Sequence, residues 1–184
     1  MIRMKFYGLG GQGVVTAAKV LSTAVSIHEG KYAITVPAYG HERRGAPVYT
    51  DMVVDDEPIL LNCFVYEPDV VVVVDPTVKD KNIDVSKGKH PDTILVLNTE
   101  SADEAAWYKK TYGFKKVYYC DATKVAVECI GRPIPNGAML GVLSRTGMVS
   151  IGSVEAALKE FFGVKAGESN ARSAAEAYER TNEM

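Results

Sequence analysis

A cluster of glycines near the start of the chain has the residue types of an anion-binding turn. Residues 8–13 match the spacing G-x-G-x-x-G, with Gly10, Gly11, Gln12 and Gly13 in the turn. Glycine adopts positive φ angles and carries no Cβ, so backbone N–H groups at the start of a following helix can approach a phosphate. The same glycines would also allow a helix to pack closely on a strand, and both interpretations stay open.

A pair of arginines provides a second candidate for anion binding. Arg43 and Arg44 stand between Glu42 and Gly45 in a polar loop at residues 38–47. The guanidinium group presents a planar fork of donors that suits phosphate or carboxylate, so two of them beside a glycine could clamp a polyphosphate. The alternative is a solvated turn in which Glu42 pairs with one of the arginines.

The remaining polar candidates are weaker. Asn136 follows a Pro-Ile-Pro turn and could present its amide to a ligand or cap a helix, and Asp75 could face a substrate or cap the next turn. No nucleophile and base stand in a recognisable pattern, so no catalytic residue is assigned. The three cysteines are scattered without a C-x-x-C pair, which indicates no metal site here, and any redox metal would belong to another chain.

The elements around these residues predict an open α/β sheet. Residues 2–7 alternate as a strand, 14–27 suit a helix and 32–36 suit the next strand, which forms a right-handed βαβ unit. The loop at 38–47 then lies at the carboxyl edge of the sheet with the glycine turn. Ligands of open α/β sheets bind at that edge, so the two motifs support each other.

The rest of the chain extends this pattern into a doubly wound, mostly parallel sheet with helices on both faces. Residues 48–54 are expected to form an inserted β-hairpin with residues 59–61. Further strands are predicted at 70–74, 93–97 and 116–120, and helices at 101–112, 121–130, 136–146 and 153–162. We expect one domain over 1–184, with a C-terminal helical tail at 163–184 that packs lightly or on a partner because it has few large apolar residues.

Composition narrows the functional class. The 184 residues carry 21 Lys and Arg against 23 Asp and Glu, so no basic excess indicates nucleic acid binding. The apolar runs are far shorter than the roughly 20 residues of a membrane-spanning helix. We therefore expect a cytoplasmic protein that neither binds nucleic acid nor enters a membrane.

A series of motifs resembles the gamma subunit of pyruvate or 2-oxoacid:ferredoxin oxidoreductases, from about residue 3 to Phe162. The motifs are Gly8-x-Gly-Gly-Gln-Gly13, Gly30-Lys-Tyr-Ala33, Pro37 to Gly40, Glu42-Arg-Arg-Gly-Ala-Pro47, Glu67-Pro-Asp69, Asp75-Pro76 and Pro135-Asn-Gly-Ala-Met-Leu-Gly141. Their combination in this order is far more specific than any one of them.

The resemblance implies a part in a larger enzyme. Members of the family work in complexes of alpha, beta, gamma and ferredoxin-like delta subunits. These complexes decarboxylate a 2-oxoacid on thiamine diphosphate with Mg, pass electrons through iron–sulfur clusters to ferredoxin or a similar acceptor, and release acyl-CoA. By the same resemblance, the gamma subunit is a module that handles coenzyme A and is not active without its partner subunits. Arg43 and Arg44 would contact phosphate, and Asn136 with the turn from Gly10 to Gly13 would line the site.

Several alternatives remain at this point. Pyruvate is the favoured acid, while 2-oxoglutarate, branched, aryl and indolyl 2-oxoacids stay open. A stand-alone dinucleotide-binding oxidoreductase is a different class, and it lacks the expected acid after the second strand, which ends Val36-Pro37-Ala38-Tyr39. A purely structural subunit, in which the glycines pack and the arginines pair with a neighbour, is the third.

Overall fold

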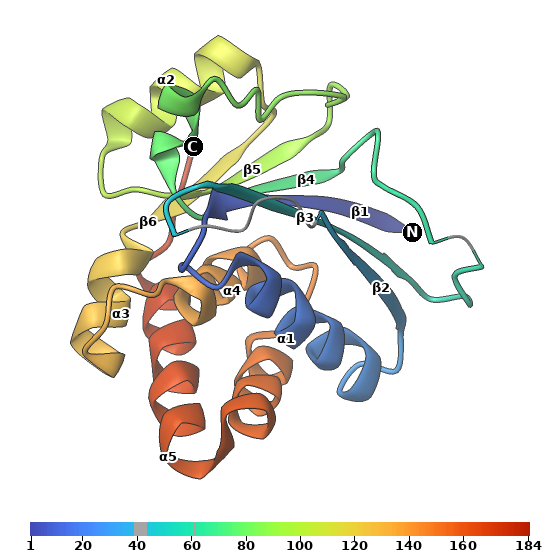
Figure 1. Cartoon of the computed structure of the whole chain (residues 1–184), viewed down its shortest axis with the longest axis vertical. Helices are drawn as coiled ribbons and strands as arrows, with labels where there is room; N and C mark the ends of the chain where they lie inside the picture. The colour runs from blue at the N-terminus through green and yellow to red at the C-terminus, as the bar shows by residue number, and fades with distance from the viewer. Residues whose placement is uncertain (39–43, 61) are drawn as a thin grey trace.

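A seven-stranded sheet in the order β2-β3-β1-β4-β5-β6-β7 forms the centre of the protein (Figure 1). The computed structural model describes residues 1–38, 44–60 and 62–184. The strands are β1 (Ile2–Leu9), β2 (Tyr32–Pro37), β3 (Pro47–Asp55), β4 (Val70–Val73), β5 (Ile94–Asn98), β6 (Val117–Cys120) and β7 (Asn182–Glu183).

Four parallel strands, β1, β4, β5 and β6, form the middle of this sheet. Every residue of β4 is buried, because helices or turns cover both faces of a central parallel strand. Val70 and Val72 pack in one core cluster and Val71 and Val73 in the other, as the alternation of side chains along a strand requires. The predicted α/β class, with helices on both faces, is confirmed.

The hairpin differs from the prediction in its partner. Strand β3 pairs antiparallel with β2 on one side and with β1 on the other, so the inserted hairpin is β2–β3. Residues 59–60 form no strand, and residue 61 lies outside the described residues. The expected pairing of residues 48–54 with 59–61 is therefore wrong. The βαβ unit also differs, because β3 separates β1 from β2.

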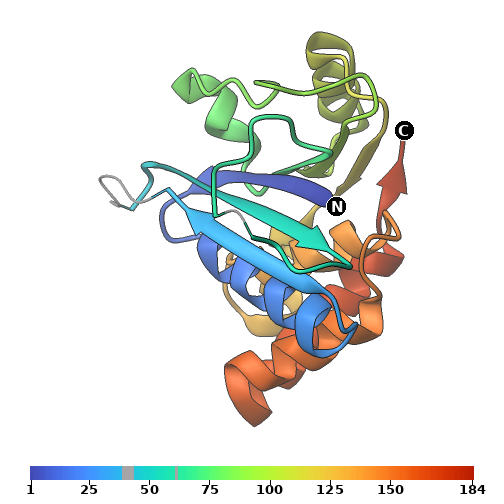
Figure 2. The ribbon, with the colours of Figure 1, turned by 90° about the vertical axis from the view of Figure 1, so that its right-hand side faces the viewer.

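The helices are divided between the two faces of the sheet (Figures 1 and 2). On one face lie α1 (Val14–Ile27), α3 (Ala122–Ile130), α4 (Asn136–Ser144) and α5 (Ile151–Glu179), and on the other lie the 3-10 helix η1 (Pro76–Lys81) and α2 (Ala102–Tyr112). The helix ends follow local sequence signals. Ser101 accepts a hydrogen bond from the backbone N–H of Glu104 and so caps α2, and Gly113 ends it in a left-handed conformation.

The C-terminal tail packs more closely than its composition suggested. Helix α5 is interrupted at Gly163, where φ is 74°, and the chain folds back into a second arm. In that arm Ala171, Ala174 and Ala177 are buried in the core. The expectation of light packing is wrong. The small side chains let the backbone of this arm come close to the backbone of α4, so the arm is buried without large apolar residues.

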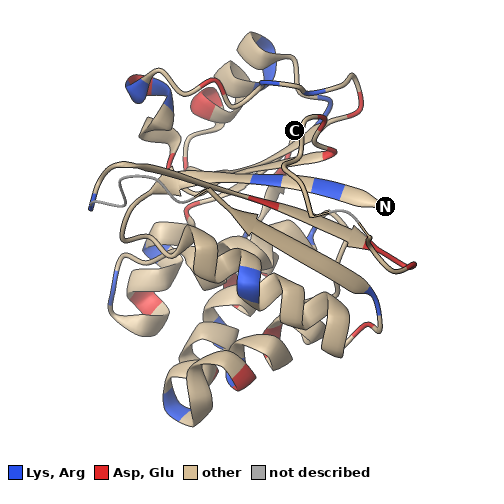
Figure 3. Cartoon of the chain, turned by 45° about the vertical axis from the view of Figure 1, so that its right-hand side comes forward, with Lys and Arg blue, Asp and Glu red and all other residues tan. Residues whose placement is uncertain are grey.

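Charged residues of both signs are interspersed in the view of Figure 3. Figure 3 shows Lys and Arg interspersed with Asp and Glu on helices, strands and loops in that view, with no side of one sign. Across the described residues, no helix has both the length and the apolar character required to cross a membrane.

Candidate functional site

The glycine turn connects β1 to α1 with its backbone in conformations that glycine tolerates best. Gly11 has a φ of 98° and Gly13 a φ of 76°. Gly13 is the N-cap of α1, and it has no side chain to cap that helix end. The first helical bond runs from the Ala17 N–H to the Gly13 carbonyl at 2.8 Å, so the N–H groups of residues 14–16 have no partner within the helix.

Two backbone hydrogen bonds hold the arginine loop against this turn. The Gly10 N–H donates to the Ala46 carbonyl at 2.8 Å, and the Gly45 N–H donates to the Gly10 carbonyl at 3.1 Å. Arg44 therefore lies beside the turn: a Cβ built on Gly11 would be 3.8 Å from both Cγ and Nε of Arg44. The predicted convergence of the two motifs at one sheet edge is confirmed for Arg44, whereas Arg43 lies outside the described residues.

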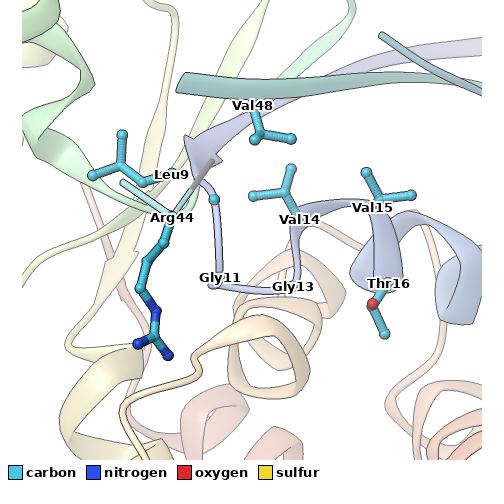
Figure 4. A pocket seen from close by; sticks show the side chains of 9 residues that line it. Leu9, Gly11, Gly13, Val14, Val15, Thr16, Arg44 and Val48 are labelled. Atoms are coloured by element: carbon cyan, nitrogen blue, oxygen red, sulfur yellow. The ribbon is translucent and has the colours of Figure 1, made fainter. Parts of the chain in front are cut away.

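The turn and the loop line an open cavity of about 440 Å³ (Figure 4). Its walls come from the turn, the first turn of α1, the start of β3 and the arginine loop. The lining residues are Leu9, Gly10, Gly11, Gly13, Val14, Val15, Thr16, Arg44 and Val48. The first turn of α1 contains no acidic residue, so the positive end of the helix dipole and the Arg44 guanidinium both favour an anion here.

Gln12 faces the interior of the turn. Its Oε1 accepts a hydrogen bond from the Leu9 N–H at 2.8 Å, and its Nε2 donates to Oδ2 of Asp75. The other oxygen of Asp75 accepts from the backbone N–H of Thr77 at 2.9 Å and from its hydroxyl at 2.6 Å, capping η1. The described contacts of the Gln12 side chain thus join the turn to the end of β4.

Asn136 lies directly behind Gly13 at the start of α4. A Cβ built on Gly13 would be 2.6 Å from the Asn136 Nδ2, so this position requires glycine for space as well as for its φ. Asn136 is buried, and its Oδ1 accepts from the Gly137 N–H at 2.9 Å. The N-cap position of α4 is Pro135, which makes no side-chain cap bond, so the Asn136 amide serves the Gly137 N–H at the start of α4, directly behind the N-terminus of α1.

The structure thus brings six of the seven predicted site residues together. Gly10, Gly11, Gly13 and Arg44 line the cavity, while Gln12 and Asn136 lie behind its wall. The sequence left two uses open for Asp75, and the structure shows that it caps the next turn, η1. Its contact with Gln12 was not predicted. Sequence reasoning did not identify the wall residues Leu9, Thr16 and Val48. Their only signal was a position within about three residues of a glycine in the turn or the arginine loop.

A second cavity, of about 530 Å³, lies over β1 and β3 near Tyr7, Tyr49, Phe64 and Tyr66. Its charged wall residue Lys5 forms a 3.0 Å ion pair with buried Asp51, and burial raises the pKa of the Tyr7 hydroxyl. Its lining also contains Lys87 and the carboxylate of Asp84, and that carboxylate opposes an anion.

The cysteines do not form a cluster. Cys63 is exposed, Cys120 is buried at the end of β6, and Cys129 lies on α3. Burial raises the pKa of the Cys120 thiol to about 11, so this thiol stays protonated at neutral pH and is a poor nucleophile. No three His, Cys, Asp or Glu side chains are grouped to hold a metal ion within the described part of the chain.

Comparison with known proteins decides the family. The model of the pyruvate ferredoxin/flavodoxin oxidoreductase family matches residues 3–180. The chain belongs to this family. The subunit is 46% identical over 98% of its length to the common gamma subunit of pyruvate/ketoisovalerate oxidoreductases from Pyrococcus furiosus, of which 97% is covered. It is 43% identical over 100% of its length to pyruvate synthase subunit PorC from Methanocaldococcus jannaschii, of which 97% is covered.

Solved structures share this fold. The crystal structure of pyruvate oxidoreductase subunit PORC from Thermotoga maritima superposes with a TM-score of 0.84 at 34% identity, covering 99% of this chain and 97% of that one. A 2-oxoglutarate:ferredoxin oxidoreductase from Magnetococcus marinus shares the fold, with a TM-score of 0.71 at 18% identity, over 96% of this chain and 30% of the larger one. The protein is thus the gamma subunit of a pyruvate or 2-oxoacid ferredoxin oxidoreductase complex, as its motifs indicated.

Proposed function

We propose that this gamma subunit binds the phosphate groups of coenzyme A in the cavity between the glycine turn and Arg44. Arg43 is predicted to share that role. Coenzyme A carries a pyrophosphate and a 3′-phosphate, and both need hydrogen-bond donors and positive charge. The N-terminus of α1, which begins with a glycine N-cap, and the adjacent guanidinium supply both. The position of Arg44 beside Gly11 is the observation that carries the proposal.

The chemistry of the reaction would belong to partner subunits. We propose that alpha, beta and delta chains hold thiamine diphosphate, Mg and iron–sulfur clusters, that ferredoxin or a similar protein accepts the electrons, and that this chain is inactive alone. The scattered cysteines support this division, since their donor set does not fit a cluster. The exposed free thiol of Cys63 suits a reducing compartment and so supports a cytoplasmic location.

The acid is proposed to be pyruvate or a near relative. The two relatives described above, at 46% and 43% identity, are both named for pyruvate, and the first is named as a gamma subunit common to pyruvate and ketoisovalerate oxidoreductases. A subunit shared by two such enzymes leaves the choice of acid to other chains, which favours a role in handling coenzyme A. The Magnetococcus marinus enzyme, whose structure has coenzyme A bound, supports the same ligand class.

The position of β3 argues against a stand-alone dinucleotide enzyme. In a dinucleotide-binding domain the first two strands are neighbours, and an acid at the end of the second reaches the ribose of a ligand over the first. Here β3 lies between β1 and β2, so the end of β2 is one strand farther from the glycine turn. We therefore keep the coenzyme A function.

Kinetics of the assembled complex test the proposal. Arg44→Ala should raise the apparent KM for coenzyme A about tenfold, which corresponds to about 1.4 kcal/mol. The Arg43→Ala/Arg44→Ala double variant should raise it further. The KM for the 2-oxoacid and the decarboxylation that precedes coenzyme A binding should stay nearly unchanged, because the variant leaves the thiamine subunits intact.

Lys110→Ala provides a control for the loss of one positive charge. Lys110 is exposed on α2, on the other side of the sheet from α1. Its variant should keep the normal KM for coenzyme A. An unchanged KM in Arg44→Ala and in the double variant would contradict the proposed function.

A further inference from the structure

The glycine turn needs an external support to keep its shape. Four of its six residues are glycines, and a glycine-rich segment loses much conformational entropy when it is ordered. Gln12 provides the only polar side chain in residues 8–13. Its carboxamide accepts from the Leu9 N–H and donates to Asp75, so one side chain closes the turn on itself and ties it to the next strand.

Two sets of hydrogen bonds fix the position of Asp75, one through the backbone of its neighbour and one through its own carboxylate. It follows β4, whose neighbouring residue Val74 donates its N–H to the Tyr7 carbonyl at 2.8 Å, next to the turn. Its Oδ1 takes both donors of Thr77, and its Oδ2 takes the Gln12 amide. Each carboxylate oxygen therefore has a separate partner, an arrangement that an amide in its place cannot reproduce, because one of its two ends is a donor.

We propose that Asp75 is a positioning residue for the phosphate-binding turn and acts through Gln12. The pair spans the gap between the carboxyl ends of β1 and β4, where the chain leaves the sheet to opposite faces, with α1 on one and η1 on the other. The carboxylate contacts Gln12 and Thr77 and is absent from the cavity wall, so it holds the N–H groups of α1 in place without opposing the anion. This inference rests on the proposed function of the cavity.

Two single variants break the pair in different ways. In Asp75→Asn the amide cannot accept from both Gln12 and Thr77. In Gln12→Glu two carboxylates face each other, and like charges at this distance repel. Each variant should raise the apparent KM for coenzyme A in the assembled complex about three- to tenfold, with kcat and the KM for the 2-oxoacid within about twofold.

The double variant Gln12→Glu/Asp75→Asn should rescue the site. The new amide at position 75 would accept from Thr77 through its oxygen and donate through its nitrogen to the new carboxylate at position 12. That carboxylate would accept from the Leu9 N–H as well, so every hydrogen bond returns with one direction reversed. The KM for coenzyme A should be lower than in either single variant. A loss that merely adds up from the two single variants would overturn the proposal.

Thr77→Ala separates positioning of the turn from capping of η1. It removes the 2.6 Å bond to Asp75 but leaves the Gln12 contact, and Thr77 is exposed and outside the cavity. It should keep the normal KM for coenzyme A, and a rise as large as that of Asp75→Asn would overturn the proposal. If a charged variant fails to assemble, Gln12→Met removes both side-chain bonds without touching the cap and must raise the KM in the same way.

The two proposals fail differently. A raised KM in Arg44→Ala with a normal KM in all the Gln12 and Asp75 variants would overturn the positioning role and keep the coenzyme A site. A normal KM in the Arg44 variants would overturn the site itself.

Discussion

The Arg44 side chain reaches the glycine turn because its loop is attached there by backbone hydrogen bonds. The bonds between Gly10 and residues 45 and 46 place the start of β3 beside the end of β1. A long, flexible side chain needs such an anchor, since ordering a free arginine costs about 2 kcal/mol of rotamer entropy. The backbone at Arg44 is therefore in place beside the turn before a ligand arrives, and only the side chain remains to be ordered by binding.

Arg44→Lys distinguishes charge from geometry. Lysine keeps the positive charge but loses the planar fork of donors. We expect the KM for coenzyme A in the complex to rise about two- to fivefold, less than in Arg44→Ala. Measurement of both variants side by side checks this order, and equal losses would show that the fork carries the whole contribution.

At the residue scale, the sequence predicted the contacts that are close along the chain. The glycine turn and the arginine loop carry recognisable local patterns and a shared sheet edge. The contact between Gln12 and Asp75 joins residues 63 positions apart. No local pattern marks such a pair, because it depends on how β1 and β4 are aligned.

The second arm of α5 is the element whose packing differs most from expectation. A Cβ built on Gly141 of α4 would lie 2.0 Å from the Ala174 carbonyl oxygen, a backbone atom that cannot move aside alone. Helices that approach this closely gain dispersion contacts between their backbones. These contacts stabilise the packing of α4 on α5 although the residues between them are alanine and glycine. Since α4 begins at Asn136, the same contact supports the helix that lies behind Gly13.

Gly141→Ala should destabilise the chain by about 1–3 kcal/mol through overpacking. Gly152→Ala on α5 is its matched control, because a Cβ there meets nothing within 4 Å. That variant should be neutral or stabilising by up to about 1 kcal/mol, since alanine is the better helix former. Urea denaturation of the full chain measures both, and equal effects would contradict the close contact.

At the element scale, sequence patterns predicted strands and helices but not their neighbours. The insertion of β3 between β1 and β2 depends on long-range pairing, and alternation along residues 48–54 is compatible with either partner. The C-terminal strand β7, only two residues long, offers no periodicity at all. The burial of the alanine-rich second arm of α5 was not predicted, because a buried helix face is recognised in a sequence mainly by its large apolar residues.

A network around Asp69 connects distant parts of the whole molecule. Asp69, just before β4, accepts hydrogen bonds from the Arg3 N–H at 2.7 Å and from the Arg3 Nε at 3.2 Å, and its Oδ1 contacts His90 at 2.9 Å. Partial burial would raise the pKa of Asp69, but the hydrogen bonds from Arg3 and His90 outweigh it and lower the pKa below its ordinary value. The start of β1 and the segment before β5 are held together here.

The sign of the shift gives a pH prediction. Because the folded pKa lies below the unfolded value of about 3.9, the carboxylate stabilises the fold fully above that pH and less as the pH falls through the folded pKa. Asp69→Asn should lower the free energy of unfolding by about 1–3 kcal/mol at neutral pH. The difference from the wild type should shrink as the pH is lowered below about 4.

Urea denaturation of the full chain over this pH range measures that difference. Asp92→Asn is the control, because Asp92 is exposed and pairs with Lys115 at 2.6 Å on the surface, where such a pair contributes little. A difference between the wild type and Asp69→Asn that is the same at neutral and acidic pH would contradict the network.

The central claim is that the glycine turn and Arg44 hold phosphate groups of coenzyme A. A structure of the purified complex with coenzyme A bound tests it most directly. We expect a phosphate of the ligand to accept hydrogen bonds from the N–H groups at residues 14–16 and from the Arg44 guanidinium. Coenzyme A bound with all of its phosphates away from this subunit's glycine turn and Arg44 would contradict the account.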